Sequence, residues 1–282
     1  MKTVIMLSDY LAIVKSIQEG LRTFWENEEI LPSMRDILTA RLETPLLPGG
    51  TDLWKKVLDS QDIIFYGGKN KEGLYRFKVD HGFNIENIVN AELVGGAVPS
   101  DSDDYSASTG TEFVIIGKSG IKGDNKDYAI RADKYESIKE KLNQGNYKIN
   151  ALEDGIFIIN KNLIPNKLIK YKKSKKIEDL TWDDIQYVND GWLEHAVGRN
   201  GASEDECLEA AKLLARYVLE AKEKDCFGGT RFEGMRFNVN TAEDGFVARH
   251  WYLDSSANRS NAHGMDNFYS YGYFLRVPKI AK

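Results

Sequence analysis

The residue types that could perform chemistry are concentrated in residues 249–275, which read RHWYLDSSANRSNAHGMDNFYSYGYFL. His250, Asp254, His263 and Asp266 carry imidazole and carboxylate groups, which are ligands of divalent metal ions in proteins. A metal site needs several such groups to lie close together, with support from neighbouring side chains. The spacing of these four residues does not by itself bring them together. Histidine and aspartate in a polar loop are more often plain surface residues, so we expect neither a metal site nor a cofactor.

The same segment is rich in aromatic rings set among small polar residues. Seven of its 27 residues are aromatic, and nine more are Ser, Asn or Gly. Rigid amphipathic rings give contact area at low entropic cost, and small polar residues supply hydrogen bonds and turns, which is typical of binding loops. The residues predicted to contact a ligand are Trp251, Tyr252, Asn258, Arg259, Asn261, Tyr269 and Tyr271. The alternative is that Trp251 and half of the rings belong to a β-sheet core.

Charge and composition exclude several classes of protein. The 282 residues carry 38 Lys and Arg against 43 Asp and Glu, a net charge of −5, so the field that would hold nucleic acid is missing. Cys207 and Cys226 are too few for a four-thiolate zinc site or a disulfide framework. Nothing approaches the roughly 18 apolar residues of a membrane span. The opening MKTVIMLSDYLAIV lacks the apolar run of a secretory signal, so we expect synthesis in a cytoplasm without export.

Helices followed by strands are predicted for the first part of the chain. Apolar residues recur at three- and four-residue steps from Leu7 to Phe24, which predicts a helix capped by Ser8. Short helices are expected after Ser33 and after Thr51. β-rich runs bounded by Gly, Asn and Asp predict strands at 62–68, 73–79, 111–117, 127–132 and 155–160. The polar stretch 98–111 predicts a mobile loop.

A lysine-rich run, KLIKYKKSKK at 167–176, has six lysines among its ten residues. Such a run repels itself and stays solvated, which favours an exposed strand end or linker. A polyanion-binding patch is the alternative, although Tyr171 alone could stack on a base.

Further helices are predicted from Asp133 to Gly145, after Thr181 and after Ser203. Strands and helices thus occur in blocks, and the predicted fold class is α+β. We expect an N-terminal helix-plus-antiparallel-sheet domain at 1–170 and a second α+β domain at 171–282.

The spacing of the C-terminal segments ARHWYLDSSANRSNA and YSYGYFLRV resembles the closing part of C-type-lectin-like domains of the formylglycine-generating-enzyme type. The matching positions are Trp251 for a strand tryptophan, Asn258–Ala262 for an Asn-x-Arg-Ser-Ala-like stretch, and Gly272, Phe274 and Arg276–Val277 for a terminal Gly-Phe-Arg-Val strand. The family's Gly-Gly-Ser before the tryptophan is replaced by Ala248, Arg249 and His250. The catalytic cysteines of that enzyme have no counterpart near this segment, so the resemblance implies no oxidase chemistry and no catalytic residue.

This resemblance implies a non-catalytic phage virion or tail-type structural protein. Phage tail proteins and diversity-generated receptor binders use such domains, and the loop between the tryptophan and the last strand contacts the ligand. The C-terminal C-type-lectin-like domain would bind a cell-surface protein or glycan, and the N-terminal part would attach to other virion or assembly proteins. Fibre and tail components are usually symmetric assemblies, so we expect a homo-oligomer located in the virion.

An intracellular phage or bacterial effector is the alternative. GLYRFKVDHGF followed by DYSASTGTEF is similar in outline to ADP-ribosyltransferases. The resemblance implies that Arg76 holds the dinucleotide, Ser108 shapes the pocket and Glu112 orients the attacked ribose. No Glu-x-Glu pair follows at a late strand, and Arg76 could equally be a strand-surface cation. A second form of this alternative is an inhibitor that binds one host protein through its acidic second part.

Overall fold

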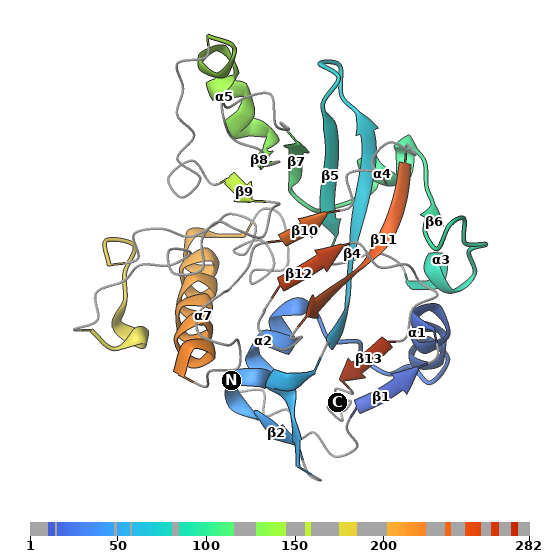
Figure 1. Cartoon of the computed structure of the whole chain (residues 1–282), viewed down its shortest axis with the longest axis vertical. Coiled ribbons are helices and arrows are strands. Elements are labelled where there is room, and N and C mark those ends of the chain that lie inside the picture. Colours follow the sequence, from blue (N-terminus) through green and yellow to red (C-terminus); the bar gives the residue numbers. More distant parts are fainter. Residues whose placement is uncertain are drawn as a thin grey trace.

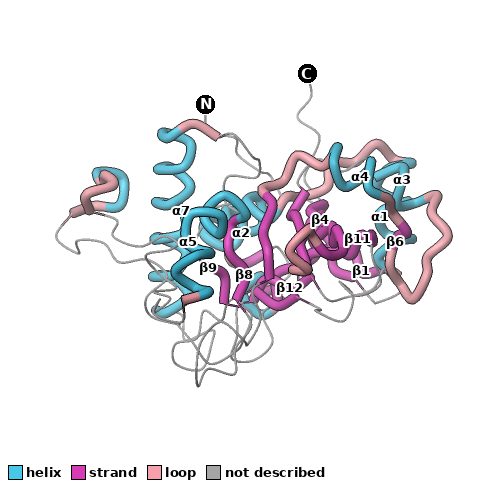
Figure 2. The backbone as a smooth tube through the Cα atoms, turned by 90° about the horizontal axis from the view of Figure 1, so that it is seen from above, coloured by secondary structure: helices cyan, strands magenta, loops and turns pink. Residues whose placement is uncertain are grey.

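The computed structural model shows an α+β fold in which helices flank one large sheet (Figure 1). The residues that the structure describes are 11–14, 16–47, 50–56, 58–80, 85–115, 128–144, 156–158, 175–184, 202–223, 235–237, 246–254, 261–264 and 272–275. Figure 2 shows helices α7 (Glu204–Glu223) and α2 (Met34–Glu43) toward one end of the sheet, and α1 (Ile17–Glu26) with α3 (Ile85–Val89) toward the other. Among the described helices, none combines the length and the apolar character that crossing a membrane requires.

The sheet has 11 strands among the described residues, and its main path runs β10-β12-β11-β4-β5-β7-β8-β9. Its strands are β1 (Leu11–Val14), β4 (Leu58–Lys69), β5 (Tyr75–Asp80), β6 (Val98–Pro99), β7 (Glu112–Ile115), β8 (Tyr128–Arg131), β9 (Ile156–Ile158), β10 (Met235–Phe237), β11 (Phe246–Asp254), β12 (Asn261–Gly264) and β13 (Gly272–Leu275). The short strands β2 (Leu46–Leu47) and β3 (Thr51–Asp52) form a separate pair. The five strands predicted between residues 62 and 160 are confirmed as β4, β5, β7, β8 and β9.

Strand β4 stands at the centre of this sheet. It pairs antiparallel with β11 on one side and with β5 on the other, and its first part also pairs with β13, where Asp59 lies opposite Phe274. The C-terminal strand β13 is in turn paired with β1, so the two ends of the described chain meet in the sheet. Strands from both sides of residue 170, the predicted domain boundary, therefore lie in one sheet.

The predicted helix from Leu7 to Phe24 is wrong at Leu11–Val14. Residues Leu11–Val14 form strand β1, and α1 begins at Ile17, capped by the side chain of Ser16, which accepts a hydrogen bond from the Glu19 backbone. The predicted cap, Ser8, lies outside the described residues. Antiparallel pairing with β13 overrides the helical spacing. The backbone groups of residues 11–14 find their hydrogen-bond partners in β13, and a local pattern does not foresee a partner so distant in the chain.

Two other predicted elements differ from the structure. The helix expected after Thr51 is only a 3₁₀ turn, η1 (Leu53–Lys55), capped by Asp52, because Leu58 already belongs to the long central strand. The mobile loop expected at 98–111 instead contains strand β6 and helix α4 (Ser102–Ala107). Asp101 caps α4 by accepting hydrogen bonds from two backbone N–H groups, and this local capping orders a stretch of small polar residues.

The remaining helices follow their predicted start signals. Ser33 and Asp36 form a complete capping box at the start of α2, and Ser203 and Glu206 exchange the same pair of bonds at α7. Helix α5 covers Ala132–Asn143, close to the predicted range. After η3 (Ile177–Asp179), residues 182–184 form a turn, in which Thr181 donates to Asp184; the rest of the helix predicted there lies outside the described residues.

Helix α1 packs on the sheet through the apolar stripe that the sequence predicts. Ile17, Leu21 and Phe24 are buried in one core cluster with Ile63 and Phe65 of β4. The Phe24 ring also contacts the ring of Phe274 in β13, with centroids 5.4 Å apart.

Candidate functional site

The predicted ligand contacts lie on, or next to, the C-terminal strands. Trp251 and Tyr252 belong to β11, and the register between β11 and β4 shifts between His250 and Tyr252. Such irregularities in a sheet are enriched beside functional sites, because they change the direction of the strand locally. Trp251 therefore occupies an irregular position in β11, beside the central strand β4.

Strands β11 and β12 form an antiparallel pair that brings two predicted contacts together. Tyr252 lies opposite His263, and Asp254 lies opposite Asn261, the first residue of β12. Asn258 and Arg259 fall between these strands in the sequence, and Tyr269 and Tyr271 fall between β12 and β13; all four lie outside the described residues. Their contact with a ligand remains a prediction.

One aromatic ring of the C-terminal segment is part of the core. Phe274 is completely buried, between α1 and the first residues of β4. The alternative that some of these rings belong to a β-sheet core thus holds for Phe274. Asp266, one of the weighed metal ligands, lies outside the described residues, and within the described ranges no three His, Cys, Asp or Glu side chains gather as a metal site would require.

The structure brings Arg76 and Glu112, two residues of the ADP-ribosyltransferase alternative, close together. Arg76 lies on β5 and Glu112 on β7, and an Arg76 guanidinium nitrogen is 3.6 Å from a Glu112 carboxylate oxygen. The guanidinium also donates a 3.0 Å hydrogen bond from Nε to the carbonyl of Gly67 and lies 4.8 Å from the centre of the Tyr105 ring. The described contacts of the Arg76 guanidinium are thus all with groups of the protein itself.

Lys78 and Tyr105 complete this cluster. The Lys78 ammonium donates hydrogen bonds to the carbonyls of Tyr105 and Ser108, at 2.9 and 3.0 Å, which ties the end of α4 to β5. Partial burial lowers the pKa of Lys78, whereas burial and the nearby Glu112 carboxylate raise the pKa of the Tyr105 phenol. Burial is the largest cause of both shifts, and the hydrogen bonds of Lys78 hold α4 on the sheet.

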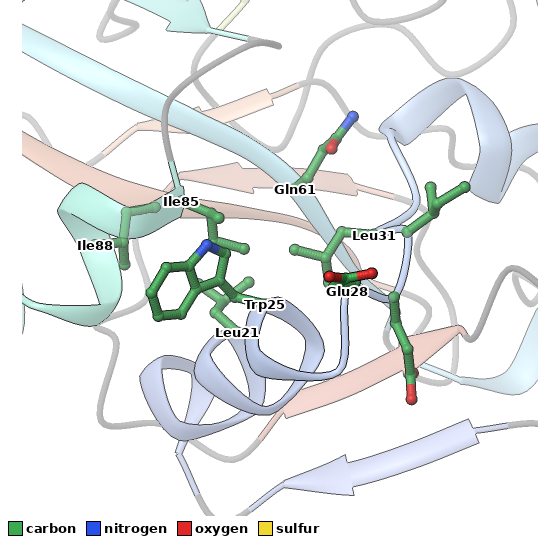
Figure 3. Close-up of a pocket in the computed structure, with 9 residues that line it drawn as sticks. Leu21, Trp25, Glu28, Leu31, Gln61, Ile85 and Ile88 are labelled. Atoms are coloured by element: carbon green, nitrogen blue, oxygen red, sulfur yellow. The ribbon is translucent and has the colours of Figure 1, made fainter. Parts of the chain in front are cut away.

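A groove that no sequence signal indicated lies between α1, β4 and α3 (Figure 3). Its volume is about 420 Å³, and it is lined by Leu21, Trp25, Glu28, Glu29, Ile30, Leu31, Gln61, Ile85 and Ile88. The apolar stripe predicted for α1 includes Leu21 but neither Trp25 nor Ile30. The groove also needs Ile85 and Ile88 of α3, whose packing beside α1 a local pattern does not encode.

No family model and no curated protein matches the chain. A solved structure that shows the accommodation of massive sequence variation in Nanoarchaeota by the C-type lectin fold is similar to it. The similarity covers 97% of this chain and 100% of that chain, with 18% sequence identity and a TM-score of 0.48. The weak C-type-lectin-like resemblance of the C-terminal segment is accompanied by an equally weak structural similarity.

Proposed function

We propose that this is a non-catalytic binding protein whose C-terminal segment, residues 249–275, contacts a ligand or receptor. The observation that carries the proposal is the position of the strands around the predicted contacts. Strand β11 is paired with β4 from Phe246 to Leu253, and β13 is held between β1 and β4. Segments between strands that are fixed in this way can present side chains from a rigid base, which is how binding loops are commonly positioned.

The setting that fits this role is a phage virion or tail, with a cell-surface protein or glycan as the ligand. The support is the resemblance of the C-terminal segment and its mixture of aromatic and small polar residues. The N-terminal part would attach to other virion or assembly proteins. In the effector alternative, Arg76 would have to exchange its contacts with Gly67 and Glu112 for a dinucleotide, which favours the binding role.

Tyr271→Ala is expected to weaken ligand binding at least tenfold while the melting temperature changes little, because a ring in a binding loop contributes contact area without supporting the fold. Binding is measured on an array of bacterial surface glycans and to intact bacterial cells. Trp251→Ala is the matched comparison: as a residue of β11, which pairs with the central strand β4, it is expected to lower the melting temperature as well. Equal destabilisation by the two substitutions would contradict a binding loop at Tyr271.

The intact protein is expected to be a symmetric oligomer, since repetition raises the avidity of weak binding tips. Light scattering measures its mass in solution. A trimer or larger ring supports the virion setting, whereas a monomer of 32.0 kDa would contradict it.

A further inference from the structure

We propose that residues Leu11–Val14 are a two-state segment. They form strand β1 in this structure, and they can instead join α1 as its first turn, which frees the edge of β13 that faces β1. Strand β13 ends the segment that the proposed function assigns to ligand contact, so the effect on ligand binding rests on that function. The two states themselves do not depend on it.

The sequence of β1 continues the helical pattern of α1. Ile17, Leu21 and Phe24 form the buried face of that helix. Val14 and Leu11 precede Ile17 by three and six positions, so in a longer helix Val14 would lie on this face and Leu11 at its border. As a strand, the sequence LAIV is apolar at all four positions and lacks the alternation that fixes one face and one register. The local sequence is therefore compatible with both forms.

The strand form of this segment is held by one neighbour. All four residues of β1 pair with β13, and among the described strands β1 pairs with no other (Figure 1). Strand β13 also pairs with β4, through Phe274 and Asp59, and the Phe274 ring packs on Phe24 of α1. Release of β1 therefore opens one short edge pair and leaves the pairing of β4 with β5 and β11 in place. Short edge elements open at a lower free energy than the central strands of a sheet.

Ser16 sets the boundary between the two elements. Its backbone is extended, with φ −140° and ψ 145°, and its hydroxyl accepts a 3.1 Å hydrogen bond from the Glu19 N–H. This cap satisfies a backbone donor at the start of α1 that has no partner within the helix. In a longer helix that N–H would bond to a carbonyl four residues earlier, and serine would be less favourable than alanine at this position. Ser16 therefore favours the strand form, and its replacement by alanine shifts the balance toward the helix.

The strand form is the one that supports ligand binding. It holds β13 between β1 and β4, close in the sequence to the predicted contacts Tyr269 and Tyr271. In the helix form, β13 loses its pairing on one edge, and the contact segment ends on a less rigid base. A partner that binds the N-terminal part in only one of the two forms would therefore change the affinity for ligand at the other end of the chain.

Ser16→Ala is expected to make the backbone amides of Gly272–Leu275 exchange with solvent about fivefold faster, which is the factor that loss of one helix cap corresponds to. Ala12→Thr is expected to slow this exchange, because threonine favours a strand over a helix. Ser33→Ala removes the equivalent cap of α2 and is the matched control. It is expected to lower the melting temperature and to leave exchange at β13 unchanged.

Hydrogen exchange and saturation-transfer NMR of the full chain provide the measurements. In the wild type, the β13 amides are expected to exchange faster than those of β4, and Ala12 is expected to show a minor state with helical carbon shifts. Equal protection of β13 and β4 would overturn the proposal, and so would a minor state with the shifts of an unfolded chain. Neither measurement needs a ligand, so failure of ligand binding by residues 249–275 would not affect this test. Weaker ligand binding by Ser16→Ala but not by Ser33→Ala is the result expected when both proposals hold.

Discussion

Replacing Arg41 with Met is expected to lower the free energy of unfolding by about 4 kcal/mol, as removal of a buried hydrogen-bonded charge does. Arg41 lies in the last turn of α2 and is completely buried. Its guanidinium donates hydrogen bonds to the carbonyls of Leu53 and Lys56, at 3.1 and 2.7 Å, and to the Tyr217 hydroxyl at 2.7 Å. A methionine fills much of the volume but leaves these three buried or half-buried acceptors without their donor.

The loss is measured by urea unfolding of the full chain, followed by fluorescence. Tyr217→Phe is the graded comparison: it removes one acceptor but keeps the ring that stacks on Trp54 at 4.9 Å, so a loss of about 1 kcal/mol is expected. Arg35→Met, at an exposed position of the same helix, is the control and is expected to change stability by less than about 0.5 kcal/mol. A loss for Arg41→Met no greater than that of the control would contradict the structural role of this cation.

Arg41 also shows why local patterns predicted α2 and α7 but not their association. The capping residues Ser33 and Ser203 and the apolar stripes predict where both helices begin and which faces they bury. An arginine on a helix predicts a solvent-exposed position, since arginine is rarely buried unless paired. Its partners here come from 12 to 176 residues away in the chain, and no spacing within either helix encodes them.

For the C-terminal strands, too, the sequence predicted the elements but not how they associate. The resemblance placed a strand at Trp251 and a last strand at Gly272 and Phe274, and both strands are present as β11 and β13. What the resemblance did not indicate is that β11 pairs with β4 and that β13 pairs with β1. Strand pairing over such separations depends on the whole sheet, whereas an apolar run or a turn signal reports only on its own few residues.

Substituting Gly67 with Ala is expected to lower the free energy of unfolding by about 2 kcal/mol through overpacking. Gly67 lies in the central strand β4, beneath the ring of Tyr105 from α4. A Cβ atom at this position would lie 2.5 Å from Cζ and 2.6 Å from Cε2 of that ring. The ring cannot move away freely, because it is buried and lies 5.9 Å from the Phe246 ring. The added methyl group must therefore displace α4 or bend the strand.

A double-mutant cycle with Tyr105→Leu tests whether the strain caused by Gly67→Ala comes from the Tyr105 ring. If the strain comes from the ring, Gly67→Ala costs much less in the Tyr105→Leu background than in the wild type, and the coupling energy exceeds about 1 kcal/mol. Thermal and urea unfolding of the four proteins provide the measurement. The same cost in both backgrounds would place the strain in the pairing of β4 with β11 instead. A large coupling would establish that the Tyr105 ring, which also lies 4.8 Å from the Arg76 guanidinium, is packed directly on Gly67 and holds α4 against the sheet.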